Sequence, residues 1–395
     1  MRKQPSDRRT FLKTAAAGVV VAGARLSLPT ARADEKPAAA LTKKIRVGLI
    51  GCGNVSDAYL TDLATRDYIE LVSVCDIIVE RAKAAAKRFK VPNHYPHIEK
   101  MLAGAPFDLL VNTTSMPAHF PLNKAALMSG KHVWSEKPMA TEVAEGRELL
   151  ALAKEKGLRL WAAPTVITSP QFRFMAETIA SGKLGHVASA RGEYGHTGPT
   201  WSEWFFQKGG GSLFDLGVYN VTTLTGLLGP AKAVVGLAGI ITPERTINGK
   251  KIQVEAEDNA MMLIDHGNAR FSHITTGFTH FSKEEHRDTT REYYTIDVVG
   301  DAGRMYLSGY DWGPHGVDLA TAKNPKVEHC CPEPGDYTWQ YGASYAANCL
   351  RTGQQGLITP EHGLHVLEVM NACKESQRNG TRVAIQSTFP WPIIK

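Results

Sequence analysis

The sequence of 395 residues lacks several features that would indicate whole classes of protein. It has no internal repeat and no low-complexity tract, which excludes solenoid and fibrous architectures. No apolar run reaches the roughly 20 residues that a membrane-spanning helix needs. The six cysteines lack the spacing of metal ligands, so we expect no metal site. In an exported protein Cys349 could pair with Cys373 or with one of the adjacent Cys330 and Cys331, and the sequence leaves this open.

A basic segment followed by a moderately apolar one opens the chain. Arg8 and Arg9 stand in DRRTFLK, which resembles the twin-arginine signal of the Tat export pathway. The apolar stretch 15–28 is too short to span a membrane, and a small-residue cleavage site ending at Ala33 follows it. We therefore expect a periplasmic or otherwise exported protein, cleaved after Ala33, with a leader over 34–43. A retained membrane anchor is the alternative.

Removal of residues 1–33 changes the charge balance of the chain. These residues hold seven of the 45 Lys/Arg and one of the 39 Asp/Glu, so the remaining 362 residues carry 38 charges of each sign. The formal net charge thereby falls from +6 to zero. A mature chain without excess basic charge gives no reason to expect a nucleic-acid partner.

The most informative stretch is KIRVGLIGCGNVS, near the start of the mature chain. Its apolar β-formers predict a strand buried on both faces of a parallel sheet. Gly51 and Gly53 then permit a tight turn, and a helix beginning near Asn54 and Val55 would aim free N–H groups at an anion. Ser56 replaces the third glycine of the G-x-G-x-x-G pattern, at a position that serves close packing. We therefore predict that this turn binds the pyrophosphate of a dinucleotide.

Asp76 ends the next predicted strand, 23 residues after Gly53. An acid about 20 residues beyond the glycines, at the tip of the second strand, binds ribose hydroxyls in this arrangement. Its carboxylate would repel a 2′-phosphate, and Ile77 stands where an NADP site would have an arginine. We therefore predict NAD rather than NADP, although Arg81 is close enough to keep NADP as the alternative. Asp76 also suits a cap of the following helix, and the two roles are compatible.

Strands and helices alternate up to residue 164, which predicts a Rossmann-type α/β domain over 44–164. Ligands bind at the carboxyl ends of the strands in such a sheet. Thr114 and Ser115 end one predicted strand, and Glu136 and Lys137 stand late in another. We expect these four residues to meet the cofactor.

Strands with more open alternation follow residue 164. They are predicted over 231–241, 252–264, 269–276 and 293–299. This pattern predicts an α+β domain over 165–395 with a large open, mainly antiparallel sheet. One face of that sheet is available to a partner, so we expect a homo-oligomer formed through it.

The stretch GGGSLFDLGVYN brings three glycines to the start of a helix predicted over 212–228. Asp215 and Tyr219 are four residues apart, so we expect them on one face of that helix. Trp201 and Trp204 precede the glycines and suit an apolar platform for a sugar ring. Core packing of these tryptophans is an equal contender.

In combination these motifs resemble those of the glucose–fructose oxidoreductase / inositol dehydrogenase (Gfo/Idh/MocA) family over essentially the whole mature chain. The matching stretches are GLIGCGNVS, VCDIIVERA, TTSMPAH, GKHVWSEKPMA and GGGSLFDLGVYN. The resemblance implies a Rossmann domain followed by an open-sheet domain. It also implies NAD(P)-dependent hydride transfer at a carbinol carbon of a sugar, polyol or related cyclic substrate.

The resemblance also assigns residues. His119 in TTSMPAH would join the cofactor contacts, and Asn220 at the end of the glycine-rich stretch would touch the substrate. Many family members have a histidine where this chain has Tyr219, and the tyrosine form is similar to the glucose–fructose oxidoreductase and dihydrodiol dehydrogenase branch. We predict that Lys137 lowers the pKa of Tyr219, which then acts as the base, while Asp215 orients the lysine or a neighbouring hydroxyl.

Two alternatives to a simple dehydrogenase remain. A redox-neutral glycosidase would oxidise the sugar, eliminate the aglycone and reduce again on the same nucleotide. A non-catalytic nucleotide-binding sensor would use the fold without the chemistry, and Lys137 and Tyr219 argue against it. No exported pool of free NAD is expected, so we predict that the cofactor is tightly bound.

Overall fold

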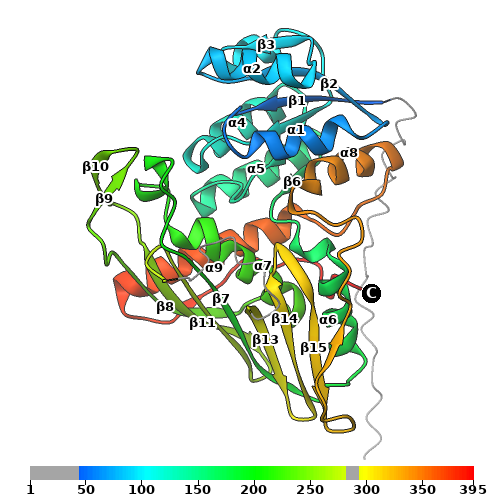
Figure 1. Cartoon of the computed structure of the whole chain (residues 1–395), viewed down its shortest axis with the longest axis vertical. Helices are drawn as coiled ribbons and strands as arrows, with labels where there is room; N and C mark the ends of the chain where they lie inside the picture. Colours follow the sequence, from blue (N-terminus) through cyan, green and yellow to red (C-terminus); the bar gives the residue numbers. More distant parts are fainter. Residues whose placement is uncertain (1–43, 282–292) are drawn as a thin grey trace, which may run out of the picture. The chain divides into compact units, whose positions relative to one another are not determined.

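The computed structural model describes residues 44–281 and 293–395 (Figure 1). The predicted signal peptide over 1–33, its cleavage site and the leader over 34–43 lie outside the described residues. The described residues belong to one compact unit. No helix in these two stretches combines the length and the apolar character that crossing a bilayer requires.

The first sheet has six parallel strands in the order β3-β2-β1-β4-β5-β6. The elements of this part are β1 (Ile45–Ile50), α1 (Ser56–Ala64), β2 (Ile69–Cys75), α2 (Val79–Phe89), β3 (Asn93–Tyr95), α3 (Ile98–Leu102), β4 (Leu109–Asn112), α4 (Met116–Met128), β5 (His132–Ser135), α5 (Val143–Glu155) and β6 (Leu160–Ala162). Strand order reverses between β1 and β4, which is where ligands bind in such sheets. Every residue of β4 and all but one of β1 are buried, as expected for strands covered on both faces.

The second sheet has nine strands in the order β16-β15-β14-β13-β7-β12-β11-β8-β17. Only the β7–β12 pair among its described pairs is parallel, so the prediction of a mainly antiparallel sheet is confirmed. Its strands are β7 (Val187–Gly195), β8 (Ala233–Gly239), β11 (Asn259–Gly267), β12 (Arg270–Gly277), β13 (Tyr294–Gly300), β14 (Gly303–Tyr310), β15 (Gly313–Thr321), β16 (Glu328–Cys330) and β17 (Val383–Ala384).

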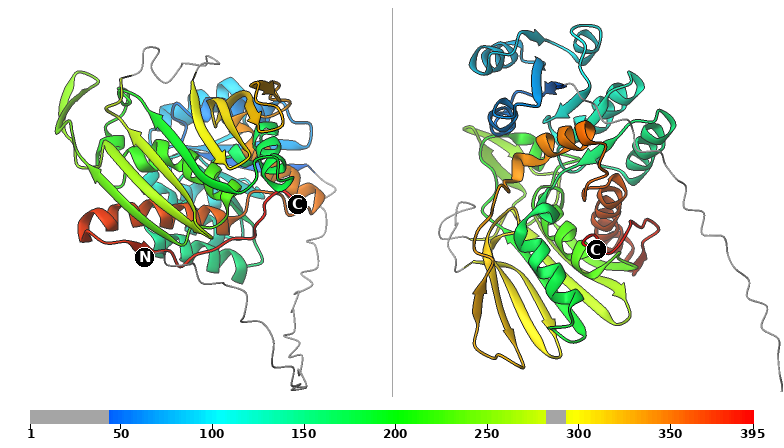
Figure 2. Two further views of the ribbon diagram at one scale, coloured as in Figure 1. Left: turned by 90° about the horizontal axis from the view of Figure 1, so that it is seen from below. Right: turned by 90° about the vertical axis from the view of Figure 1, so that its right-hand side faces the viewer.

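Helices cover one face of this second sheet. They are α6 (Pro170–Ala180), α7 (Val218–Leu228) and α9 (Pro360–Asn379), each in contact with its strands. The left view of Figure 2 looks onto the strands with helices behind them. Residues of β11 alternate between buried and exposed, because one side chain in two faces the helices. The opposite face carries exposed apolar side chains, namely those of Val235, Leu237, Met261, Leu263 and Phe271.

The strand predicted over 252–264 is wrong as a single element. The chain forms a separate hairpin of β9 (Glu244–Ile247) and β10 (Lys250–Gln253), and β11 starts only at residue 259. The backbone N–H groups of Glu255 and Ala256 donate to the carbonyl of Phe206, so this segment bonds to the short 3-10 helix Glu203–Phe206 and leaves the sheet.

The last part of the chain returns to the first sheet. The turn η5 (Trp339–Tyr341) and helix α8 (Gly342–Thr352) contact α1, and α8 also contacts β1 and β5. The Tyr68 hydroxyl donates to the carbonyl of Ser344 at 3.3 Å. A single boundary at residue 164 therefore describes the order of the chain, whereas the packing of the first domain includes α8.

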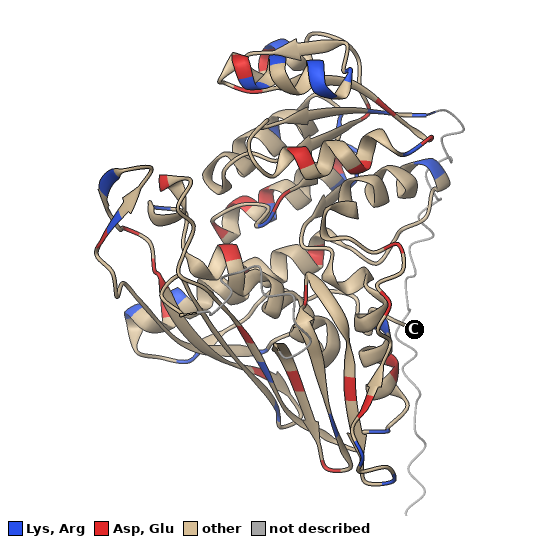
Figure 3. Cartoon of the chain, in the orientation of Figure 1, with Lys and Arg blue, Asp and Glu red and all other residues tan. Residues whose placement is uncertain are grey.

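Charged side chains of both signs are interspersed along the described elements (Figure 3). Arg46 pairs with Asp108 at 2.6 Å, and Lys124 with Glu148 at 2.6 Å, both partly exposed pairs of small energetic weight. The six cysteines are free thiols. Within the described stretches no group of three His, Cys, Asp or Glu side chains is arranged to hold a metal ion.

Candidate active site

The glycine turn after β1 has one side packed and one side open. Gly51 has φ +92°, and a Cβ there would lie 2.7 Å from the backbone of Thr113, so only glycine fits. A Cβ at Gly53 would meet nothing within 4 Å. Ser56 is 1% exposed, and its Oγ donates to the Gly53 carbonyl at 2.6 Å. The turn therefore presents an open backbone surface at Gly53, as an approaching phosphate requires.

Helix α1 begins at Ser56, two residues later than predicted. Within the described residues the N–H groups of Gly53, Asn54 and Val55 donate to no protein acceptor. Together with the positive end of the helix dipole, these donors form an anion-binding surface. The residues present therefore fit the pyrophosphate of a dinucleotide.

Asp76 lies beside this turn at the end of β2 and is 7% exposed. One carboxylate oxygen accepts the N–H of Cys52 at 2.7 Å and the other that of Ile78 at 2.7 Å. An ionised carboxylate can accept further hydrogen bonds, so ribose hydroxyls remain possible partners. The neighbouring Ile77 is 80% exposed and leaves no cation there to bind a 2′-phosphate. This geometry fits NAD.

The turn after β4 is held by side chains behind it. Asn112 accepts hydrogen bonds from the N–H of Thr114 at 3.2 Å and from its hydroxyl at 2.7 Å, and Ser115 precedes α4. His119 is 1% exposed, with its ring nitrogens 2.7 Å from the Pro138 carbonyl and 3.0 Å from the Thr114 carbonyl. His119 therefore holds two site loops together and is not open to a cofactor, which corrects its predicted contact.

Glu136 and Lys137 lie in a loop directly after β5, which ends at residue 135. Glu136 is 7% exposed, and its Oε1 accepts the hydroxyl of Tyr59 at 2.5 Å. Its Oε2 accepts the backbone N–H of Lys137 at 3.0 Å. The carboxylate therefore fixes the backbone from which the lysine side chain extends.

Lys137 meets Asp215 from the second domain. Its Nζ donates to Asp215 Oδ1 at 2.7 Å and to the Asp215 carbonyl at 2.9 Å, and both side chains are under 15% exposed. The same Nζ lies 5.1 Å from the ring centroid of Tyr219. The structure thus brings together the three residues predicted to carry the chemistry.

Asp215 stands in a π-helical turn, Leu213–Gly217, which continues into α7. Such wide turns occur frequently at functional sites, and here the Asp215 carbonyl accepts the lysine ammonium. The turn is fixed at its start by Glu257, whose carboxylate accepts the N–H of Leu213 at 3.0 Å. Gly211 has φ +109°, and a Cβ there would collide with this carboxylate, so packing against the protein explains that glycine.

The protonation state of Tyr219 differs from the prediction. Burial raises the pKa of Tyr219 well above its ordinary value, and the negative charges of Glu136 and Asp215 raise it further. Lys137 does not reverse this, because its ammonium is paired with Asp215 and faces the ring of the tyrosine. No hydrogen bond of the Tyr219 hydroxyl is made within the described residues. Tyr219 is therefore a neutral phenol able to donate a proton.

The predicted substrate residues take different positions. Asn220 is fully buried and donates to Asp311 at 3.0 Å, so it anchors α7 and is not open to a substrate. Trp204 stacks on Phe205 with ring centroids 3.7 Å apart. Trp201 is 44% exposed and meets Phe205 edge-on at 5.7 Å. The two tryptophans thus form an aromatic cluster before the π-helical turn.

Other aromatic residues near Tyr219 escaped the sequence analysis. Tyr194 on β7 lies 6.0 Å from Tyr219 and 4.8 Å from Tyr310, measured between ring centroids. Trp312 donates its indole N–H to the Tyr194 hydroxyl at 3.0 Å. Tyr310 ends β14 and Trp312 lies in the turn after it, 118 residues beyond Tyr194, so no local motif could have joined them to Tyr194. Tyr59 could have been found from the sequence. It lies three residues beyond Ser56, on the buried face of α1.

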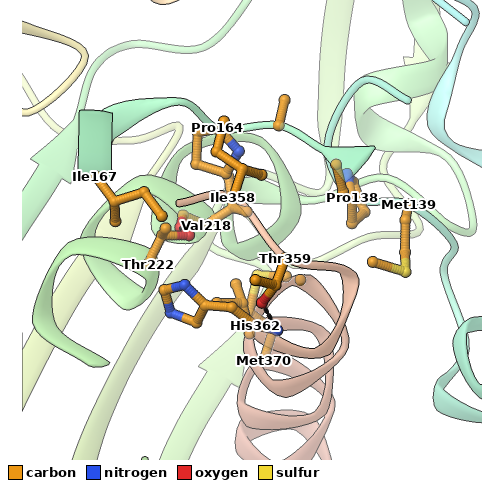
Figure 4. A pocket seen from close by; sticks show the side chains of 14 residues that line it. Pro138, Met139, Pro164, Ile167, Val218, Thr222, Ile358, Thr359, His362 and Met370 are labelled. Carbon is orange, nitrogen blue, oxygen red and sulfur yellow. Dashed lines mark hydrogen bonds between the residues drawn. The ribbon is translucent and has the colours of Figure 1, made fainter. Parts of the chain in front are cut away.

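A small cavity lies behind the lysine loop (Figure 4). Its volume is about 20 Å³, room for one water molecule. Mostly apolar side chains line it, including Pro138, Met139, Val218 and Ile358, together with His362. The cavity is too small for a substrate.

Two family models match the chain, and together they span most of it. Residues 45–163 match the model described as "Oxidoreductase family, NAD-binding Rossmann fold" (GFO_IDH_MocA). Residues 172–306 match the GFO/IDH/MocA C-terminal domain. The first match includes Lys137, and the second includes Asp215 and Tyr219.

Known proteins are similar along nearly their whole length. The human (Homo sapiens) trans-1,2-dihydrobenzene-1,2-diol dehydrogenase is 26% identical over 359 residues, which cover 88% of this chain and 98% of that protein. The WlbA dehydrogenase of Bordetella pertussis, in complex with NADH and UDP-GlcNAcA, superposes with a TM-score of 0.72 at 22% identity, over 87% of this chain and 99% of that chain. A levoglucosan dehydrogenase in complex with NADH gives 0.73 at 19% identity, over 87% and 100%. With the glycine turn, Asp76 and the Lys137–Asp215 pair in place, this chain belongs to the GFO/IDH/MocA family of NAD-binding oxidoreductases.

Proposed function

We propose that this oxidoreductase exchanges hydride at a hydroxyl-bearing carbon of a cyclic diol or sugar, on a tightly bound NAD. The observation that carries the proposal is the meeting of Lys137 and Asp215 across the two domains, with Tyr219 beside them. The relatives at 26% identity are named for oxidation of a diol, which supports a substrate with adjacent hydroxyls. The nucleotide, when bound, supplies the hydride acceptor or donor.

The protein side chains supply the proton and the charge. The Lys137 ammonium, held by Asp215, is placed to donate a hydrogen bond to the substrate oxygen and to stabilise negative charge on it. Since Tyr219 is neutral, its phenol is the proton donor to that oxygen when a carbonyl is reduced to an alcohol. In the oxidative direction Tyr219 must first lose its proton to solvent, and its phenolate oxygen then accepts the proton of the substrate hydroxyl. Asp215 orients the lysine ammonium through its 2.7 Å hydrogen bond.

A two-step experiment tests this function. The purified protein is denatured and the released nucleotide is identified by mass spectrometry, and then the native protein is mixed with trans-1,2-dihydrobenzene-1,2-diol and with a panel of sugars. NAD in the first step and NADH formation in the second support a dehydrogenase. Release of sugar from a glycoside without NADH accumulation would establish the redox-neutral glycosidase instead. Bound NAD without any turnover would favour the sensor.

Export through the Tat pathway is the second part of the proposal. It rests on Arg8 and Arg9 and on the small residues that end at Ala33. A tightly bound cofactor fits this route, because Tat carries folded proteins. Replacing both arginines by lysine should leave the precursor in the cytoplasm, which cell fractionation measures. Unchanged export of that variant would contradict the assignment.

Self-association through the open sheet is the third part. The exposed apolar side chains of β8 and β11 pair across strands, Leu237 opposite Met261 and Val235 opposite Leu263. An apolar face of this kind is typical of a contact between copies. Sedimentation equilibrium should give an oligomer for the parent and a monomer for Leu237→Glu. An oligomer of unchanged size in that variant would place the contact elsewhere.

A further inference from the structure

Tyr59 is a buried tyrosine at the site that the proposed chemistry does not use. It is fully buried on α1, the helix that follows the glycine turn, and its hydroxyl donates to Glu136 Oε1 at 2.5 Å. Its ring meets Trp339 edge-on at 5.9 Å. Tyr59 therefore links the dinucleotide helix to the loop that carries Lys137.

The hydrogen bond from Tyr59 occupies one of the two oxygens of the Glu136 carboxylate. One oxygen takes the tyrosine hydroxyl and the other the backbone N–H of Lys137. The Lys137 ammonium pairs instead with Asp215 at 2.7 Å. A buried carboxylate one residue away would attract that ammonium strongly if one of its oxygens lost its donor.

We propose that Tyr59 is a positioning residue: its hydroxyl occupies Glu136, so that the ammonium of Lys137 stays with Asp215 and the substrate. This inference rests on the proposed function, because it assigns Lys137 the role of binding the substrate oxygen. It concerns a residue that touches neither the reacting carbon nor Asp215.

The groups that face Glu136 come from four elements. They are Tyr59 from α1, His119 from α4, Tyr219 from α7 and Lys137 from the loop of Glu136 itself. Burial raises the pKa of both tyrosines and lowers the pKa of His119, so these three are neutral near pH 7. Loss of the tyrosine donor therefore leaves the lysine ammonium as the only strong partner among these groups for the carboxylate.

Tyr59→Phe tests the proposal, with Tyr68→Phe as a matched control. Tyr68 also donates its hydroxyl across to another segment, at 3.3 Å to the Ser344 carbonyl, without contact to Glu136. We expect Tyr59→Phe to lower kcat by about 10- to 100-fold, as loss of a hydrogen bond to a charged group does, while the Kd for NADH stays unchanged. Tyr68→Phe should change neither.

A double variant separates positioning from general stability. If Tyr59 acts through Glu136, adding Tyr59→Phe to Glu136→Gln should cost little beyond Glu136→Gln alone. Additive losses would overturn the proposal, and so would a Tyr59→Phe enzyme with the parent kcat.

A readout without substrate keeps the two proposals apart. Acetic anhydride labelling of Lys137, followed by peptide mass spectrometry, should be slower in Tyr59→Phe than in the parent, because the freed carboxylate holds the ammonium. Equal labelling rates would overturn the positioning role. Failure of the proposed function would appear differently, as a parent protein that turns over none of the diol or sugar probes.

Discussion

The two sides of the site are built in different ways. On the first-domain side, the site residues follow the ends of strands. Backbone groups at Gly53 and at the turn after β4 form much of this surface. On the second-domain side, a π-helical turn is held by Glu257, and α7 is anchored through Asn220 to Asp311. The first side is arranged by turns at the ends of neighbouring parallel strands, and the second by contacts between segments 44 and 91 residues apart.

This difference separates binding from chemistry. The first-domain side offers donors and an acid to a nucleotide and contributes one reactive side chain, Lys137. The second-domain side contributes Asp215 and the neutral phenol of Tyr219. We therefore expect changes at the glycine turn and at Asp76 to act mainly on cofactor affinity, and changes at Lys137, Asp215 and Tyr219 to act mainly on turnover.

Tyr219→Phe is expected to have one of the largest effects. Loss of a positioned acid costs about 10²–10⁴-fold in rate. Because the phenol makes no hydrogen bond within the described residues, the fold and the Kd for NADH should be unchanged. Stopped-flow oxidation of bound NADH by a keto-sugar measures the step. A parent rate in this variant would clear the tyrosine of the proton transfer.

Acid should next weaken the packing at the end of α7, where His362 lies 2.8 Å from the Thr225 hydroxyl and His266 lies 2.8 Å from the Gly229 carbonyl. Burial lowers the pKa of His362 to about 3 and those of His365 and His266 to about 4. Each is depressed below the ordinary value, so the unfolded chain binds more protons, and stability is present above pH 6.5 and lost as the pH falls below it. The loss should be ~1.4 kcal/mol per pH unit for each histidine, measured by urea unfolding.

A histidine variant checks that slope. His266→Gln should remove one histidine from the pH dependence, so its unfolding free energy should fall less steeply between pH 6.5 and 5. The same slope in the variant and the parent would show that this histidine is not neutral in the folded protein.

The paired substitutions Gly53→Ala and Gly51→Ala address the nucleotide side. A methyl at Gly53 meets no protein atom, so stability should hold while the Kd for NADH rises by about tenfold, ~1.4 kcal/mol. A methyl at Gly51 collides with the Thr113 backbone, so that variant should lose stability as well. Fluorescence titration and thermal unfolding separate the two. Unchanged NADH affinity in Gly53→Ala would remove the pyrophosphate from this turn.

The smallest expected effect is on the choice of cofactor. Ile77→Arg places a cation beside Asp76 on an exposed position, so NADP binding should improve by about 1 kcal/mol relative to NAD. Competitive titration of the two nucleotides measures the ratio. A ratio that does not move would indicate that Ile77 lies away from the ribose.

The sequence predicted the first side of the site far better than the second. Gly51 and Gly53 follow one strand and Asp76 follows the next, so their spacing in the sequence predicts their positions in the site. The state of Tyr219 was predicted wrongly, because the burial that raises its pKa and the approach of Glu136 arise only in the folded chain. His119 and Asn220 were assigned by resemblance and lie buried on internal partners. The packing of α8 against the first sheet could not be predicted, because no local sequence pattern indicates which distant segment a helix will contact.

The central claim is that Lys137 and Asp215 act as one unit across the two domains. The most direct test is single-turnover hydride transfer with NADH-loaded parent, Lys137→Ala and Asp215→Asn enzymes, each with its Kd for NADH measured. The account predicts losses of about 10²–10⁴-fold for Lys137→Ala and a smaller loss for Asp215→Asn, with NADH affinity nearly unchanged. Transfer at the parent rate in Lys137→Ala, with NADH still bound, would contradict it.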